Sequence, residues 1–244
     1  MKLEYFDIHS HLNFSAFDSD REEVIKRMQD EKVFTISVGT DLKTSKEVAD
    51  LADKNENIFA TIGLHPDDNK KEDFNPEDYK ELAENKKVVA VGECGLDYYR
   101  IKNHESGLKN KQKEIFEKLR GLVNEQIGIV IVDSISMLYR LELGKSEEVF
   151  EVNSALGKQI GCLVEIARRF KIPVLITNQV YADFDNRDKV KMVGGDLLKY
   201  GSKCLIELRR FSGFRGMVLR KHRSLPEGKE LKFDVVHKGI LEIN

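Results

Sequence analysis

Short apolar runs alternate with charged, amphipathic segments through the first half of the chain. The apolar runs predict four strands, over Tyr5–His9, Val33–Val38, Ile58–Gly63 and Val88–Glu93. The segments between them predict helices over Asp20–Glu31, Ser45–Lys54 and Pro76–Asn85. Ser19 and Glu22 have the S-x-x-E spacing of a capping box at the start of the first helix. This alternating order implies parallel strands with right-handed crossovers.

The second half has a different pattern. A helix over Lys111–Glu125 leads to apolar strands over 128–133 and 172–180, which flank a long helical segment, Ser146–Phe170. Three later strand-like segments follow without intervening helices: Ser202–Arg209, Gly216–Arg223 and Glu230–Val236. The whole pattern predicts an α/β fold, with a mostly parallel sheet flanked by helices and an antiparallel edge. Because the late strands do not alternate with helices, an open sheet is favoured over a closed barrel.

Charge is unevenly distributed along the 244 residues, whose formal net charge is −2. Residues 1–115 contain 18 basic and 25 acidic side chains, a net charge of −7, and residues 116–244 contain 22 and 17, a net charge of +5. A basic C-terminal half suggests contact with nucleic acid. A chance excess of cations on solvated helices is an equally good explanation of the charge alone.

Cysteine use and apolar run lengths indicate a cytoplasmic protein. The three cysteines, Cys94, Cys162 and Cys204, are widely spaced and form no C-x-x-C motif, which argues against a disulfide framework. The longest apolar run, Ile127–Val132, is too short to span a bilayer. We therefore expect no membrane association.

Candidate metal ligands follow the predicted strands. His9 and His11 are two residues apart, so their imidazoles project from one face at the end of the first strand. His65 follows the third strand and Glu93 ends the fourth. Chemistry in parallel α/β folds gathers at the carboxyl ends of strands. Imidazole nitrogens presented as a pair suit Zn²⁺, Ni²⁺ or Mn²⁺.

These residues lie in motifs that resemble the TatD family of metal-dependent deoxyribonucleases, which have TIM-barrel folds. The matching segments, in family order between about residues 4 and 118, are Asp7–Leu12, Phe17–Val24, Val38–Leu42, Gly63–Pro66 and Gly92–Tyr99. The resemblance implies that His9 and His11 bind one divalent metal (Zn, Mn or Mg) and that Glu93 bridges it to a second. It also implies that His65 lies near the substrate phosphate and that Glu93 and His65 are the catalytic residues.

The family also requires two further histidines and a late aspartate from the second half of its barrel. The next strand here, 128–133, ends in Asp133-Ser134 without a histidine. The remaining histidines, His104, His222 and His237, do not stand in the family's local context. We therefore expect one metal in place of two.

From about residue 116 the chain resembles the archaeal RadB and RadA branch of the RecA recombinases. The similar segments are 129–135, 172–180, 193–198 and 225–228. The resemblance makes 129–133 a Walker B strand, in which Asp133 and Ser134 would serve Mg²⁺–ATP, and makes Asn178 and Gln179 sensors of the γ-phosphate. Segment 181–196 would be a mobile loop facing DNA.

Basic residues on the late strands would add a DNA-binding surface. They are Arg209, Arg210, Arg215, Arg220, Lys221 and Arg223. A solvated sheet edge, protected from pairing by its charge, explains the same run equally well.

An ATPase of this type needs G-x-x-x-x-G-K-[ST] before its Walker B strand. The sequence has no such motif, and the one Gly-Lys-Ser, at 144–146, follows Asp133 and has Tyr139 where the first glycine should be. We read it as loop and helix-cap chemistry, and we expect no ATP binding.

The two resemblances meet near residues 110–125, inside one predicted helix and without a linker. We therefore predict a chimera in which 1–115 is a TatD-like half-barrel segment and 116–244 is a RadB-like core segment, packed as one domain. Two functions stay open: a metal-dependent phosphodiesterase with weak or no activity on DNA, and a RadB-like DNA-binding module without ATPase activity.

Overall fold

The computed structural model describes residues 5–68, 72–98, 101, 106–122, 127–144, 149–182, 190–236 and 239–243. The chain divides into two compact units, Met1–Gln126 and Ile127–Asn244. Each unit is described by itself below. Within the described ranges, no helix combines the length and the apolar character that a membrane span requires.

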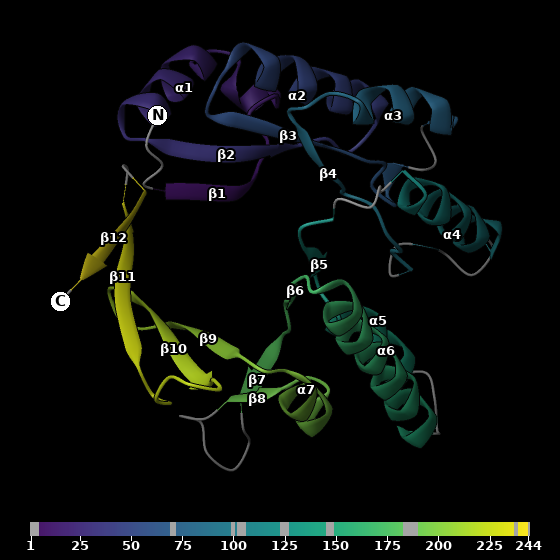
Figure 1. The fold of residues 1–244 in the computed structure, drawn as a ribbon, viewed down its shortest axis with the longest axis vertical. Coiled ribbons are helices and arrows are strands. Elements are labelled where there is room, and N and C mark those ends of the chain that lie inside the picture. The colour runs from purple at the N-terminus through teal and green to yellow at the C-terminus, as the bar shows by residue number, and fades with distance from the viewer. Residues whose placement is uncertain are drawn as a thin grey trace. The chain divides into compact units, whose positions relative to one another are not determined.

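Unit 1 contains a four-stranded parallel sheet in the order β1-β2-β3-β4. The strands are β1 (Tyr5–Ser10), β2 (Val33–Val38), β3 (Ile58–Ile62) and β4 (Val88–Val91). The helices are α1 (Arg21–Asp30), α2 (Leu42–Lys54), α3 (Pro76–Ala83) and α4 (Ser106–Arg120), with a 3-10 turn, η1, over Ser15–Phe17. Figure 1 shows α1, α2 and α3 on one face of this sheet. The predicted parallel sheet flanked by helices is confirmed.

The core of unit 1 lies between this sheet and its helices. Ile58, Ala60 and Ile62 are fully buried at every second position of β3, as expected for one covered face of a strand. They belong to two clusters, one with Val48 of α2 and one with Leu119 of α4. The opposite face of the sheet has stacked aromatic rings, with 6.2 Å between the ring centroids of Phe6 and Phe59.

Helix capping differs from the prediction. The N-cap of α1 is Asp20, and its side chain makes no cap hydrogen bond, so the predicted Ser19–Glu22 capping box is wrong. The reason is that Ser19 lies one residue before the N-cap. A capping box does form at α2. The Asp41 carboxylate accepts from the Thr44 backbone N–H at 2.7 Å, and the Thr44 hydroxyl oxygen accepts from the Asp41 backbone N–H.

Glu72 joins α2 and α3 near the loop that follows β3. Its carboxylate accepts from the Leu42 backbone N–H, at the positive end of the α2 dipole, and from the hydroxyl of the fully buried Tyr79, both at 2.8 Å. Burial, and secondarily this hydrogen bond, raise the pKa of Tyr79, so the phenol stays protonated. Glu72 thereby anchors the loop between β3 and α3 to both α2 and α3.

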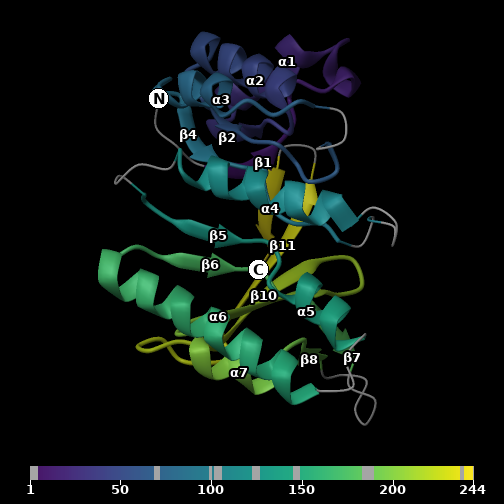
Figure 2. The same ribbon diagram turned by 90° about the vertical axis from the view of Figure 1, so that its right-hand side faces the viewer.

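Among its described residues, unit 2 has three sheets. β5 (Val130–Val132) and β6 (Val174–Ile176) form a parallel pair, and β7 (Val180–Ala182) and β8 (Val190–Met192) form an antiparallel pair. The four-stranded antiparallel meander consists of β9 (Leu205–Arg210), β10 (Arg215–Lys221), β11 (Glu230–Val236) and β12 (Gly239–Ile243). The helices are α5 (Ser136–Leu143), α6 (Val149–Phe170) and α7 (Gly195–Gly201). Figure 2 shows α5 and α7 beside the long α6.

The predicted meander is present, but two expectations on element boundaries differ. The predicted helix over Lys111–Glu125 begins earlier, at Ser106, and α4 ends at Arg120. The strand predicted over 172–180 is divided into β6 and β7. In the described residues of unit 2, β5 and β6 pair in parallel with each other. Apolar patterning identifies strands but does not select their neighbours, because any parallel strand edge offers the same backbone groups.

Candidate metal centre

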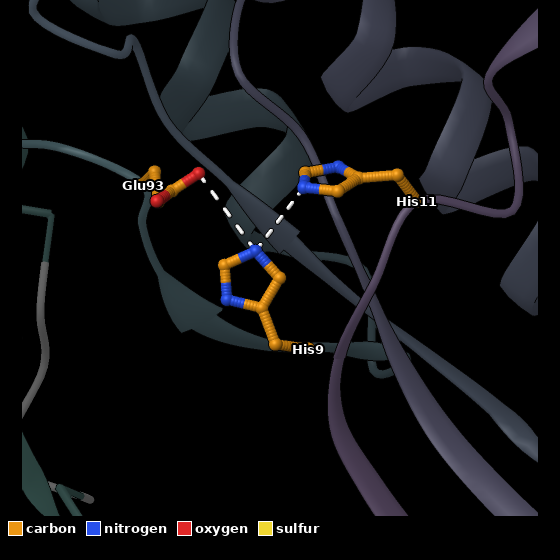
Figure 3. A group of neighbouring side chains, drawn as sticks. All are labelled: His9, His11 and Glu93. Atoms are coloured by element: carbon orange, nitrogen blue, oxygen red, sulfur yellow. Dashed lines mark hydrogen bonds and ion pairs between the residues drawn. The ribbon is translucent and has the colours of Figure 1, made fainter.

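Three side chains from two strand ends of unit 1 converge on one point. His9 and His11 come from the end of β1, and Glu93 follows β4 (Figure 3). The two Nε2 atoms of the histidines are 3.1 Å apart, and Nε2 of His9 is 3.9 Å from Oε2 of Glu93. Within the described residues, this is the one group of His, Cys and acidic side chains whose ligand atoms all lie within 4.8 Å of one another.

The His11 ring is held in one orientation. Its Nδ1 lies 3.0 Å from the Val38 carbonyl oxygen, which can only accept, so Nδ1 carries the proton. The ring also stacks on Phe14, with 4.4 Å between centroids. This orientation directs Nε2 to the point where His9 and Glu93 converge, as a metal ligand requires.

The position of Glu93 depends on close backbone packing. Its backbone N–H donates to the Gly39 carbonyl at 3.3 Å. A Cβ on Gly63 would lie 2.6 Å from the Glu93 carbonyl oxygen, and a Cβ on Gly39 would lie 2.5 Å from Oγ of Ser45. The buried Ser45 hydroxyl accepts from the Gly63 N–H at 3.3 Å. These two glycines therefore let the chain segments after β2, β3 and β4 approach closely.

The distances from Nε2 of His9 to the other two ligand atoms fit a divalent cation. Nitrogen and oxygen ligands bind Zn²⁺ at about 2.0–2.2 Å, so two atoms on one ion lie at most about 4.4 Å apart. The His9–His11 and His9–Glu93 distances of 3.1 and 3.9 Å are within this limit. The side chains of His9 and Glu93 are 45% and 42% exposed, so a bound ion would keep positions open to solvent and substrate.

His65 is close in the fold but is not part of this group. Its backbone N–H donates to the Thr40 carbonyl at 2.8 Å, and its Nδ1 accepts from the Asp67 N–H at 3.2 Å. Nδ1 is thus an acceptor, which leaves Nε2 as the N–H donor of the ring. Cys94, next to Glu93, is half-buried, and burial, followed by the Glu93 charge, raises the pKa of its thiol to about 11. Of the histidines outside the family context, His104 and His237 lie outside the described residues.

The residues expected at a nucleotide site gather at the ends of β5 and β6. Thr177 donates a hydrogen bond from its hydroxyl to the exposed Asp133, and Oγ of Ser134 lies 3.3 Å from Oγ of Ser136. The Asn178 amide donates to the Val193 carbonyl at 2.9 Å, and the Gln179 side chain accepts from Arg140 at 2.8 Å. Both amides are therefore engaged within unit 2. Residues 183–189, which are part of the segment 181–196 expected to face DNA, lie outside the described residues.

The basic residues of β9 and β10 divide into two groups. Arg209 and Arg220 both donate to Glu207, and Lys221 donates to the carbonyls of Lys199 and Ser202. Burial alone would raise the pKa of Glu207, but the hydrogen bonds from both arginines outweigh it and lower the pKa. In the part of the chain that the structure describes, the exposed side chains of Arg210 and Arg223 make no ion pair or hydrogen bond.

Family models match both parts of the chain. The model described as TatD related DNase matches residues 6–132, and the Rad51 model matches residues 74–243. Each covers more than half of the chain. The matches overlap over 74–132, which includes the 110–125 region where the sequence resemblances meet.

The chain is also similar to individual archaeal proteins called DNA repair and recombination protein RadB. The relative from Methanobrevibacter smithii is 42% identical over 122 residues, which are 48% of this chain and 51% of the relative. This chain thus spans about half the length of that protein. The relative from Methanococcus maripaludis strain C7 is 39% identical over 180 residues, covering 67% of this chain and 81% of the relative.

Two solved structures are partly similar. A TatD homologue from Escherichia coli has a TM-score of 0.47 and 22% identity, covering 68% of this chain and 64% of its own. A RadB recombinase has a TM-score of 0.42 and 20% identity, covering 98% of this chain and 90% of its own. On the two family-model matches, this chain belongs to the TatD related DNase family over residues 6–132 and to the Rad51 family over residues 74–243.

Proposed function

We propose that unit 1 binds one divalent cation through His9, His11 and Glu93 and hydrolyses DNA phosphodiesters slowly. The observation that carries this proposal is the convergence of the three ligand atoms within 4.8 Å, on a segment that belongs to the TatD related DNase family. The open, half-exposed position of His9 and Glu93 leaves room for a DNA backbone. The proposal includes a chimeric origin, with the RadB-like segment in place of the second half of a barrel.

A bound cation would supply charge neutralisation at the phosphate and an acidified water. The chain's own residues would orient the substrate. His11 is fixed through Val38, and the protonated Nε2 of His65 can donate to a phosphate oxygen. The further histidines and the aspartate that the TatD resemblance requires are not found in their expected contexts in the sequence. Because catalytic groups act as a unit, we expect turnover far below that of a complete two-metal site.

A cleavage assay tests the proposal. Fluorescently labelled single- and double-stranded DNA is incubated with the protein and Mn²⁺, Zn²⁺ or Mg²⁺, and products are resolved on denaturing gels. We expect slow cleavage with at least one ion, its loss in EDTA, and a decrease of at least about tenfold in Glu93→Ala. Equal cleavage by wild type and Glu93→Ala would assign the activity to a contaminant. Absence of cleavage with all three ions would contradict the nuclease proposal.

DNA binding by unit 2 is the second candidate function, and we propose it on a different observation. Arg210 and Arg223 are exposed on or next to β9 and β10 without side-chain partners among the described residues. The chain is 39% identical to a protein whose name is DNA repair and recombination protein RadB. In this function unit 2 binds the DNA backbone without ATP, because the sequence has no phosphate-binding G-x-x-x-x-G-K-[ST] loop.

Fluorescence anisotropy across a series of salt concentrations tests this second function. Each lost phosphate contact lowers the magnitude of the slope of log K against log salt by about 0.7–0.9, so Arg210→Glu with Arg223→Glu should lower it by roughly 1.4–1.8. Arg120→Glu is the control, because Arg120 lies on α4 and already pairs with Glu117. A slope unchanged by the double variant would exclude this surface as the DNA-binding site. ATP at millimolar concentration should leave the wild-type affinity unaltered.

A further inference from the structure

A buried glutamine joins the two loops that carry His65 and Glu93. Gln112 lies on α4 and is only 4% exposed. Its side-chain amide donates to the Pro66 carbonyl at 3.1 Å and to the Asp97 carbonyl at 3.2 Å, and its amide oxygen accepts from the Asp97 backbone N–H at 3.0 Å. One side chain thus binds the backbone of both loops.

The positions of these contacts relate them to the candidate site. Pro66 directly follows His65, and Asp97 is four residues after Glu93. The loops leave the carboxyl ends of the neighbouring strands β3 and β4, which pair in parallel. Gln112 comes from a third element, so α4 ties the two loops together where the sheet hydrogen bonds have ended.

The chemistry of the amide suits this position. Both of its N–H donors and its oxygen are used, and the surroundings are nearly free of water. Hydrogen bonds at buried sites are stronger than at the surface, and breaking them leaves backbone groups unsatisfied. Gln112 precedes Ile115 and Leu119 by three and seven residues, so it lies on the apolar stripe of α4, where a leucine or methionine would be the ordinary residue. Burying the Gln112 amide here removes its hydrogen bonds with water, and its hydrogen bonds to the two loops must offset that loss.

We propose that Gln112 is a positioning residue that holds the Glu93 loop and the His65 loop together and thereby sets the metal affinity of the His9–His11–Glu93 group. This inference rests on the proposed metal binding by unit 1. The residue touches neither the metal nor the substrate. It acts on Glu93 through the backbone of the loop that follows β4.

The test compares Gln112→Met with Leu119→Ala. Methionine has about the side-chain volume of glutamine but can make none of the three hydrogen bonds. Leu119 is fully buried on the same helix, in the cluster with Ile62 and Ile115, so Leu119→Ala loosens α4 without removing the amide. In isothermal titration with Co²⁺, we expect the dissociation constant to rise about tenfold in Gln112→Met, in the range seen for residues that support metal ligands, and less than about twofold in Leu119→Ala.

A second readout uses the metal-free protein. Hydrogen–deuterium exchange should be faster over 63–68 and 93–97 in Gln112→Met than in Leu119→Ala when both are compared at equal unfolding free energy. If Gln112→Met does not fold, Gln112→Asn, which is one methylene shorter, replaces it in both measurements, with the same expected direction.

The outcomes separate the two proposals. Wild-type Co²⁺ affinity in the Gln112 variant, or an equal loss in Leu119→Ala, would overturn the positioning role while leaving the metal site standing. Absence of Co²⁺ binding by the wild-type protein would overturn metal binding, and with it any influence of Gln112 on affinity. The exchange measurement then reports whether the loop connection itself is real.

Discussion

Replacing His9 or His11 with alanine is expected to weaken Co²⁺ binding by more than about 100-fold, because each removes one of three protein ligands. The Nε2 atoms of His9 and His11 are only 3.1 Å apart. The group at this point holds no third histidine that could take the place of either one. Loss of His11 also removes the imidazole oriented by the Val38 carbonyl. Isothermal titration and the visible spectrum of bound Co²⁺ both measure the effect.

His222→Ala is the matched control for this experiment. His222 belongs to unit 2, and its Nδ1 accepts from the backbone N–H groups of Ser224 and Leu225. The His222→Ala substitution thus removes an imidazole that has local hydrogen bonds but is not part of the candidate centre. Affinity unchanged in His9→Ala and His11→Ala, or weakened equally in His222→Ala, would show that Co²⁺ binds elsewhere or without specificity.

Gly63→Ala is expected to displace Glu93 and to weaken Co²⁺ binding at least about tenfold. An added Cβ would lie 2.6 Å from the Glu93 carbonyl oxygen and 2.7 Å from the Gly92 carbonyl carbon, and both contacts are with backbone atoms that cannot rotate away. Inserting a methyl group into close packing costs about 1–3 kcal/mol. We therefore also expect a lower free energy of unfolding, measured by urea denaturation.

Gly107→Ala serves as the control for the added methyl group. Gly107 lies in α4, and a Cβ there would meet no atom within 4 Å. Because alanine favours helix over glycine by about 1 kcal/mol, this variant should be as stable as wild type or more stable. Unaltered metal affinity in Gly63→Ala would mean that Glu93 does not depend on this close approach.

The strands of unit 1 could be predicted because each is a short apolar run bounded by polar residues, and β3 buries Ile58, Ala60 and Ile62 on its helix-covered face. The predicted bounds of Val33–Val38 match β2, and those of the other three strands differ by one or two residues. The grouping of His9 with His11 followed from the two-residue period of a strand. Among the late strands, the predicted Glu230–Val236 matches β11, while the ends predicted for the two strands before it differ, since charged residues such as Arg210 and Arg215 continue the ladder of β9 and β10.

Gln112 was not singled out from the sequence. The available signal was a polar residue at the position expected to be apolar on α4, three and seven residues before Ile115 and Leu119. A glutamine on a helix has too many explanations for this spacing alone to identify its partners. The same limit applies to Glu207, whose two arginine partners come from its own strand and from β10.

Local pattern was sufficient for the α/β class, the parallel order of unit 1 and the placing of His9, His11 and Glu93 at strand ends, because side-chain period and strand direction are properties of short segments. Tertiary structure alone decided that Glu93 comes within 3.9 Å of His9, that Gln112 joins two loops, and that Arg209 and Arg220 share Glu207. These contacts join residues that are mostly far apart along the chain. They depend on which strands are neighbours and how closely backbones approach, which a single sequence does not encode locally.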